Sequence, residues 1–435
     1  YWKILIINFQ ILGSKEINLC YINSMKKLFS MILILGLLSS GNALAKKPKK
    51  SPLLKLPKLL QYEHYIASEG NNIKMKKRKI KDNPVGEIVT FNSGDAAFLF
   101  NVLDGSYKNQ EYTITGHLTF PKGEGKFPVL IYAHGSGGAK SFINRDDYLF
   151  YEETHKKLID MGIAVFYIDN FSGRGVKDTW RDQSVSTIFG QAVDAYAAFN
   201  FLKNHPKVNK NKIGITGHSR GGNVSMNVID TKIRDVFLNK SEQFAASMPI
   251  ATECRMFLYE NPSPTKTKVL VVHGELDNYT LAKPCEQYAK KLKNSGGDVD
   301  TLIIQGAYHS FFGNWVVDYY KQIQTLNECP FVVTTLDDGW LNDEFMNYVV
   351  ERVNDWKTIE DGKAAIKNNP GKAFMKAARE SIMHNKKGCA SYGADEGGDW
   401  GWQGKNKPWK KKSESKIYNE FMFKYLNFWK ETLLR

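Results

Sequence analysis

Short apolar runs alternate with amphipathic stretches along the chain from residue 112 onward. Residues 112–121 alternate apolar and polar side chains, which is typical of an antiparallel strand with one solvated face. Residues 127–135 are almost continuously apolar, which indicates a strand buried on both faces. The same reasoning predicts further strands over residues 163–171, 212–218, 244–251, 268–274 and 300–307.

The amphipathic stretches between these strands predict helices. Gly162 and Pro206 mark two helix ends, because glycine favours the position after a helix and proline cannot continue one. The predicted helices cover residues 147–162, 186–205, 221–229, 282–297 and 417–434. Strands alternating with helices predict an α/β fold with a doubly wound, mostly parallel sheet. In such sheets, reactive groups gather in the loops after the carboxyl ends of the strands.

The first methionine is Met25, and the residues after it have the pattern of a secretion signal. Two lysines, a short apolar segment ending at Leu38, and small residues before a cleavage site after Ala45 follow in that order. We therefore expect residues 1–24 to be upstream read-through, residues 25–45 to be a signal peptide, and the mature protein to be periplasmic or secreted. The alternative is a transmembrane anchor, but about a dozen apolar residues are too few to span a bilayer.

Positive charge is concentrated in a basic leader over residues 46–82. This leader holds twelve Lys or Arg and three Asp or Glu, so it carries +9 of the total formal charge of +15, while the chain after it carries only +3. Such a segment is either a nucleic-acid arm or a solvated leader that touches an anionic envelope surface. We favour the second interpretation after a signal peptide and predict no nucleic-acid partner.

The remaining chain divides into a predicted α/β core over residues 83–315, an insertion or cap over 316–415, and a final helix over 416–435. The insertion is longer than an α/β core needs at this point. Its aromatic cluster is either the core of a small subdomain, which we favour, or a surface that binds aromatic or sugar groups. The tryptophans of the insertion are Trp340, Trp356, Trp400, Trp402 and Trp409.

The chain has five cysteines, of which Cys20 precedes the predicted signal peptide. The four cysteines that follow the signal peptide are an even number, which in an exported protein suggests two disulfides with three possible connectivities. The simplest pairing joins Cys254 to Cys285 within the core and Cys329 to Cys389 beyond it. Four reduced, buried thiols are the alternative if the protein is not exported.

The stretch "GHSRGG" stands where the predicted strand 212–218 meets the predicted helix 221–229. A serine at such a turn needs small residues two positions before and after it, because strand and helix crowd together, and Gly217 and Gly221 meet that need. The turn exposes the Ser219 hydroxyl and aims the next backbone N–H, that of Arg220, at a developing oxyanion. This pattern predicts a nucleophile elbow, and the alternative is a tight glycine turn with an incidental serine.

A serine nucleophile needs a histidine base that is oriented by a carboxylate, in the chain order Ser, acid, His. Asp277 follows one predicted strand and His309 follows the last one, so both are expected at the edge that carries Ser219. Glu275 is the rival acid, and His384 is the main rival base. The other rival histidines are weaker, since two lie within predicted helices or their ends, His273 lies within its strand and His218 is locked into the elbow.

The stretch "HGSGG" follows the predicted strand 127–135 and offers backbone N–H groups to a ligand. A tetrahedral intermediate needs a second donor besides Arg220, and we predict the amide of Ser136, with Gly137 as the second choice. The alternative is a glycine-rich turn without a role. Neither a phosphate-binding loop with Gly-Lys-Ser/Thr nor a GxGxxG before a helix is present.

Substrate-binding residues are predicted in the stretch "NFSGRGVKDTWRDQ". Arg174 could hold a substrate carboxylate in a bidentate pair, with Trp180 beside it, although we favour the alternative that Arg174 braces its own loop. The stretch "ADEGGDW" has three carboxylates but lacks the spacing of a calcium loop. We predict no metal and no organic cofactor.

The sequence resembles the dienelactone hydrolase family of the α/β-hydrolase superfamily over about residues 110–315. The resemblance depends on "HGSGG", "DNFSGRG", "GHSRGG", "GELDNYTLAKPC" and "AYHSFF", in the order that the family shows them. It implies an α/β-hydrolase fold and a triad of Ser219, Asp277 and His309. The acid loop followed by Cys285 is similar to the exported branch, which supports bridging Cys285 to Cys254.

The enzymes that name the family use a cysteine nucleophile, whereas this sequence has Ser219. The sequence therefore predicts hydrolysis of ordinary small-molecule or polymeric carboxylic esters through an acyl-enzyme. A serine peptidase or amidase on the same fold, and a non-catalytic envelope-associated binding protein, are the alternatives. Comparable rates on an amide and an ester would favour the first, and failure of a serine-directed phosphonate to label Ser219 would favour the second.

Overall fold

The computed structural model describes nine stretches of the chain. The predicted read-through, signal peptide and basic leader all lie outside them. The described stretches are residues 86–139, 149–179, 186–312, 318–320, 332–334, 338–351, 355–368, 398–400 and 416–435.

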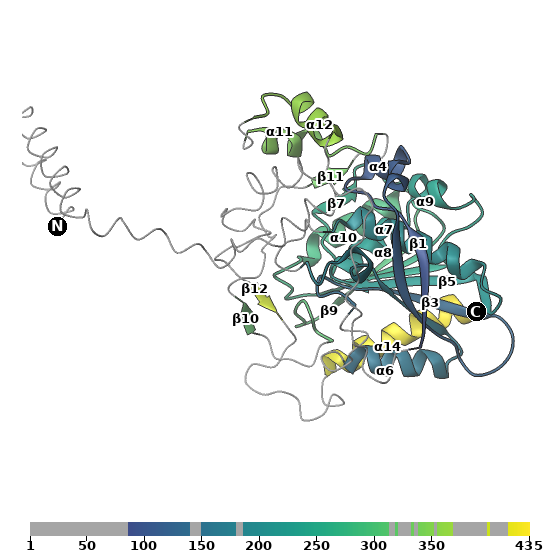
Figure 1. Cartoon of the computed structure of the whole chain (residues 1–435). Coiled ribbons are helices and arrows are strands. Elements are labelled where there is room, and N and C mark those ends of the chain that lie inside the picture. Colours follow the sequence, from purple (N-terminus) through teal and green to yellow (C-terminus); the bar gives the residue numbers. More distant parts are fainter. Residues whose placement is uncertain are drawn as a thin grey trace, which may run out of the picture. The chain divides into compact units, whose positions relative to one another are not determined.

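An eight-stranded sheet forms the centre of the fold, in the order β1-β2-β4-β3-β5-β6-β8-β9 (Figure 1). Strand β2 is antiparallel to both of its neighbours, and all the other pairs are parallel. This arrangement confirms the predicted α/β-hydrolase fold. The strands are β1 (Glu87–Ser93), β2 (Tyr112–Thr119), β3 (Phe127–Ala133), β4 (Ala164–Asp169), β5 (Val208–His218), β6 (Ala246–Ile250), β8 (Lys268–Gly274) and β9 (Val299–Ile304).

Burial along the strands follows from their place in the sheet. All six residues of β4 are buried, as expected for a central strand covered on both faces. Strand β1 lies at one edge and exposes much of its length, so its apolar residues form no continuous run. This is why the apolar pattern did not predict β1.

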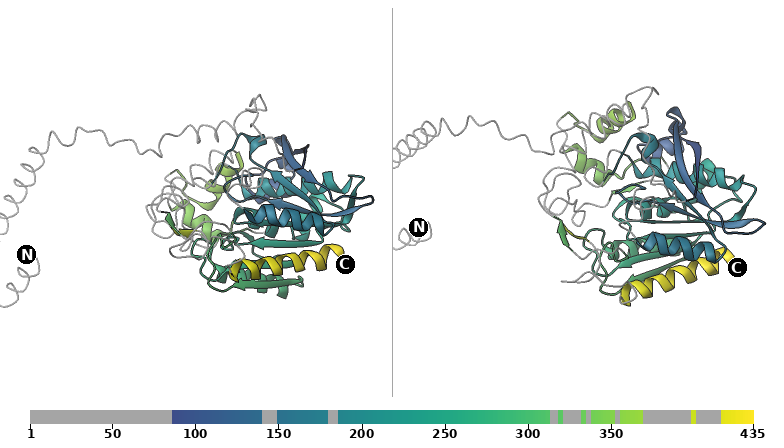
Figure 2. Two further views of the ribbon diagram at one scale, coloured as in Figure 1. Left: turned by 90° about the horizontal axis from the view of Figure 1, so that it is seen from below. Right: turned by 60° about the horizontal axis from the view of Figure 1, so that its bottom comes forward.

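Helices cover both faces of the sheet, which buries two separate apolar layers. Helices α6 and α14 lie side by side on one face, where Phe150 contacts the rings of Phe421 and Tyr425 (Figures 1 and 2). Five other helices of the core cover the opposite face. Helices α6 and α14 span Leu149–Asp160 and Lys416–Trp429. The opposite layer comprises α4 (Leu99–Leu103), α7 (Ile188–Lys203), α8 (Arg220–Asn227), α9 (Thr231–Phe237) and α10 (Ala282–Asn294).

The last helix is anchored by a large aromatic residue. The Trp429 side chain is fully buried, and its ring packs on Gly214 in β5, where an added Cβ would lie only 2.8 Å from the ring. The predicted final helix of the core thus packs against the sheet, and a π-helical turn, Lys430–Leu434, follows it.

The described parts of the insertion are short elements that add to the core. Strand β11 (Val332–Thr334) pairs in parallel with β7 (Met256–Tyr259), and β10 (Asp318–Tyr320) pairs with β12 (Gly398–Trp400). Helices α11 (Asp343–Val350) and α12 (Ile359–Asn368) complete these elements.

Two of the predicted tryptophans have described side chains. The Trp340 ring stacks on Phe100 of α4 at 4.5 Å between ring centroids, and the Phe100 N–H donates to the Gly339 carbonyl at 3.1 Å. Trp356 is buried and packs beside Gly362. The Trp340 ring therefore packs against the α/β core, and the Trp356 ring packs against helix α12.

Candidate active site

Ser219 stands alone between the last residue of β5 and the first residue of α8, in a strained backbone conformation. Its φ is 57° and its ψ is −119°. Among the described non-glycine residues, Ala251 alone shares a positive φ. Such a conformation costs about 1–3 kcal/mol and persists only where the surrounding structure enforces it. The Ser219 N–H donates to the Ile250 carbonyl at 2.8 Å, which fixes the turn to β6.

The two glycines of the elbow are required by close backbone contacts. A Cβ on Gly217 would lie 2.4 Å from the Gly221 carbonyl group, and a Cβ on Gly221 would lie 2.0 Å from the carbonyl oxygen of Ala133. No real Cβ makes such contacts. Strand β5, helix α8 and the end of β3 are thus pressed together around Ser219.

Asp277 and His309 meet in the loops after β8 and β9. The Nδ1 atom of His309 lies 2.9 Å from Oδ2 of Asp277, and both side chains are fully buried. The other carboxylate oxygen accepts the backbone N–H groups of Tyr279 at 3.0 Å and Thr280 at 2.9 Å. The structure therefore brings the predicted acid and base together.

The charge of Asp277 is sustained by its partners. Burial disfavours the ionised carboxylate, but the His309 charge and the hydrogen bonds from His309 and Thr280 outweigh burial, and the pKa of Asp277 is lowered from its ordinary value. The rival acid Glu275 is exposed and accepts the Gly306 N–H at 2.8 Å instead. The rival base His384 lies outside the described residues.

The histidine before Ser219 links the elbow to the loop that carries His309. Nε2 of His218 donates to the His309 carbonyl at 3.0 Å, and the two rings lie 4.8 Å apart between centroids. Burial lowers the pKa of His218 from 6.5 to about 3, helped by the nearby His309 charge. His218 is therefore neutral at pH 7, and its role is to hold the backbone of His309 beside Ser219.

The predicted oxyanion loop lies against the elbow. A Cβ on Gly135 would lie 3.7 Å from the Ser219 Cβ and 3.1 Å from the His218 carbonyl oxygen. Ser136 follows Gly135 and Arg220 follows Ser219, so each predicted donor is one residue from this contact. The Ser136 carbonyl accepts the Thr179 N–H at 2.7 Å, which holds the loop in place.

The Arg220 side chain has a structural use that the elbow pattern does not reveal. Its Nε donates to Oε1 of Gln191 in α7 at 2.5 Å, and its guanidinium also donates to the Ser186 carbonyl. The side chain thereby fastens α8 to α7. The predicted oxyanion role concerns its backbone N–H and not this side chain.

The Arg174 guanidinium is buried and engaged, which supports the favoured alternative, a bracing role, over substrate binding. It makes a bidentate pair with Asp194 and donates to the carbonyls of Asn170 at 2.9 Å and Gly94 at 2.8 Å. These contacts are those of the bracing alternative, since they tie the loop after β4 to α7 and β1. Trp180 lies outside the described residues.

Cys254 and Cys285 are joined by a disulfide, the first of the two predicted pairs. The bridge connects the loop after β6 to the first turn of α10, directly after the loop that carries Asp277. Cys329 and Cys389 both lie outside the described residues.

Three further side chains lie near the Asp277–His309 pair. The sequence pattern did not predict Thr280 or Glu253, and His273 was considered only as a weaker rival base. The Thr280 hydroxyl lies 2.9 Å from both Asp277 Oδ2 and His309 Nδ1. His273 reaches the same carboxylate oxygen at 3.7 Å, and burial raises the pKa of Glu253 to about 8. The spacing Asp-x-x-Thr was the available signal for Thr280, because a hydroxyl three residues after an aspartate can bond back to it.

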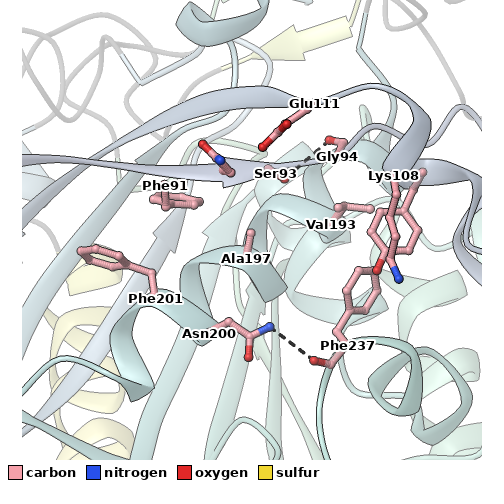
Figure 3. A pocket seen from close by; sticks show the side chains of 12 residues that line it. Phe91, Ser93, Gly94, Lys108, Glu111, Val193, Ala197, Asn200, Phe201 and Phe237 are labelled. Atoms are coloured by element: carbon pink, nitrogen blue, oxygen red, sulfur yellow. Dashed lines mark hydrogen bonds between the residues drawn. The ribbon is translucent and has the colours of Figure 1, made fainter.

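A cavity of about 520 Å³ lies elsewhere, between β1 and α7 (Figure 3). Phe91, Phe201 and Phe237 give it an apolar wall, and Lys108 and Glu111 add charge. None of its lining residues is a predicted catalytic residue. Within the described stretches, no three His, Cys, Asp or Glu side chains are grouped as a metal site requires. No helix among them is long and apolar enough to span a membrane.

Residues 114–324 match the model of the family described as the dienelactone hydrolase family. Part of the chain is similar to Est1E from Butyrivibrio proteoclasticus, with 17% identity and a TM-score of 0.33 over 46% of this chain and 86% of that chain. It is also similar to a thermophilic esterase from Thermogutta terrifontis, with 14% identity and a TM-score of 0.37 over 54% and 87% of the two chains. A comparison with curated proteins finds no match.

Gly221→Ala tests the crowding at the elbow. Alanine is the better helix former by about 1 kcal/mol, but its methyl group would clash with the Ala133 carbonyl. We expect the free energy of unfolding to fall by more than about 2 kcal/mol in denaturant titrations. Gly137→Ala is the control, because no atom of the described residues lies within 4 Å of its added Cβ. Equal stability of the two variants would contradict the close packing.

His218 predicts a specific pH dependence of stability. Below pH 6.5 the unfolded chain protonates His218, whereas the folded protein keeps it neutral. The stability that the neutral His218 contributes is therefore fully present above pH 6.5 and is lost as the pH falls toward 3. We expect the unfolding free energy of the wild type to fall relative to His218→Gln by up to about 1.4 kcal/mol per pH unit.

The comparison with His218→Gln isolates this one group. The raised pKa of Glu253 makes stability change with pH in the opposite direction. Its contribution is fully present below about pH 4.5 and is lost as the pH rises toward 8, because the unfolded chain ionises first. Glu253 is present in both proteins, so its effect cancels in the difference. Parallel stability curves for the two proteins between pH 4 and 7 would show that His218 is not the responsible group.

Proposed function

Because residues 114–324 belong to the dienelactone hydrolase family, we propose that the chain is a serine hydrolase that cleaves carboxylic esters. The proposed nucleophile is Ser219, with His309 as the base and Asp277 as the acid that orients it. One observation carries the proposal: a strained serine at a strand–helix turn is joined through His218 to the loop of a buried His–Asp pair.

The first half of the proposed reaction forms an acyl-enzyme. Nδ1 of His309 faces Asp277, so the proton of Ser219 is accepted at Nε2 while the serine oxygen attacks the ester carbonyl. The N–H groups of Ser136 and Arg220 stabilise the oxyanion, and the N-terminus of α8 adds partial positive charge. The imidazolium then gives its proton to the leaving alcohol, and Asp277 stabilises this ion without itself taking the proton.

The second half releases the acid. Water gives a proton to Nε2 of His309 and attacks the acyl carbonyl, a second tetrahedral intermediate forms in the same oxyanion site, and the proton returns to Ser219 as the ester bond breaks. A serine alkoxide and an alcohol are similar leaving groups, which suits serine to esters. This difference from a cysteine nucleophile is why we propose ordinary esters as the substrate class.

We also propose that the enzyme works outside the cytoplasm. The pattern of a signal peptide over residues 25–45 supports export. The disulfide between Cys254 and Cys285 is compatible with it, because such bonds persist mainly in oxidising compartments.

A panel of p-nitrophenyl esters tests the function, with a matched p-nitroanilide as the amide. We expect the wild type to cleave esters and Ser219→Ala to lose roughly 10⁴-fold or more in kcat. Ser225→Ala is the control, since this serine lies on the same helix and its hydroxyl donates to the Gly221 carbonyl at 2.9 Å. It should keep its ester activity. Equal rates for wild type and Ser219→Ala would refute the proposal, and faster cleavage of the anilide would replace esterase by amidase.

A further inference from the structure

The Thr280 hydroxyl occupies the centre of the proposed catalytic pair. Its oxygen lies 2.9 Å from Asp277 Oδ2, 2.9 Å from His309 Nδ1 and 3.0 Å from the Ala251 carbonyl oxygen. The side chain is buried, so no bulk water competes for these contacts. Asp277 and His309 belong to the loops after β8 and β9, and the third neighbour, Ala251, directly follows β6.

Proton counting shows what this hydroxyl does to His309. The hydroxyl has one hydrogen, which goes to the Ala251 carbonyl or to Asp277, since both are acceptors. If the hydrogen went to Nδ1 instead, an unprotonated Nδ1 would face the Asp277 carboxylate at 2.9 Å, with a lone pair against a negative charge. Thr280 and Asp277 thus both favour the tautomer with its proton on Nδ1, which leaves Nε2 as the basic nitrogen.

The contact of Thr280 with Ala251 connects the His309–Asp277 pair to the backbone that holds Ser219. Ala251 has a φ of 46°, and its N–H donates to the Val272 carbonyl at 2.8 Å, so its backbone is firmly held. The residue before it, Ile250, accepts the N–H of Ser219. One short stretch of backbone at the end of β6 therefore holds the nucleophile on one side and the Thr280 hydroxyl on the other.

We propose that Thr280 is a positioning residue of the catalytic pair, whose hydroxyl fixes the His309 ring to the β6 backbone that also holds Ser219. This inference rests on the proposed function, because its effect on turnover requires the triad to be active. Thr280 also gives its backbone N–H to Asp277, and that contact survives a change of side chain. The hydroxyl alone is therefore the group to test.

Three variants separate positioning from packing. Thr280→Val removes the hydroxyl and keeps the branched shape, and Thr280→Ser restores the hydroxyl. Thr252→Val is the matched control, because Thr252 is buried in the loop after β6 and its hydroxyl has no hydrogen-bond partner among the described residues. Thermal unfolding establishes that each variant is folded.

We expect Thr280→Val to lose roughly tenfold or more in kcat, the size of one net hydrogen bond, with KM little changed. The acidic limb of its kcat/KM profile should move relative to the wild type. Thr280→Ser and Thr252→Val should keep the wild-type kcat and pH profile. A Thr280→Val enzyme with wild-type kcat, or the same loss in Thr280→Ser and Thr280→Val, would overturn the proposal.

A second readout does not depend on turnover. The Nδ1 proton of His309 should give a low-field proton resonance in the wild type that moves in Thr280→Val and is restored in Thr280→Ser. If the wild type cleaves no ester, the proposed function fails, and this resonance still decides the role of Thr280. An unmoved resonance in Thr280→Val would overturn the positioning role whatever the activity.

Discussion

The close approach of helix α8 to the end of β3 is the constraint on which the rest of the site depends. A Cβ on Gly221 would lie 2.0 Å from the Ala133 carbonyl oxygen, so only glycine permits this contact. The short connection from β5 to α8 then forces Ser219 into its positive φ. That conformation places Ser219 at the turn and lets helix α8 begin at the next residue. The strain at one residue is therefore a consequence of packing that involves three elements.

The order of the strands turns this local feature into a site. Strands β5, β6, β8 and β9 are consecutive neighbours, so the loops after them meet at one edge of the sheet. Strand β6 is followed by none of the three proposed catalytic residues, yet it lies between the strands that precede Ser219 and Asp277. Its end holds the Ser219 N–H through Ile250 and the Thr280 hydroxyl through Ala251. The disulfide at Cys254 ties the same loop to α10.

Much of this was predictable because it follows from local rules. Buried strands need continuous apolar runs, and an elbow needs glycines at fixed spacing, so the sheet and the turn at Ser219 could be read from the chain. The apolar pattern did not predict edge strand β1, because the exposed face of this strand breaks the pattern. The partner of Arg174 could not be identified from the sequence, because Asp194 is twenty residues away in another element and only folding shows that the pair is buried. The spacing Asp-x-x-Thr could have indicated the contact of Thr280 with Asp277, but no spacing connects its hydroxyl to Ala251 and His309.

The central claim is that Ser219, His309 and Asp277 act as one unit beside the amides of Ser136 and Arg220. A crystal structure of the protein after reaction with a serine-directed phosphonate measures this most directly. We expect phosphorus bonded to the Ser219 oxygen, a phosphoryl oxygen that accepts hydrogen bonds from both amide N–H groups, and Nε2 of His309 within hydrogen-bond distance of the adduct. An unmodified Ser219, or an adduct with the His309 imidazole out of reach, would contradict it.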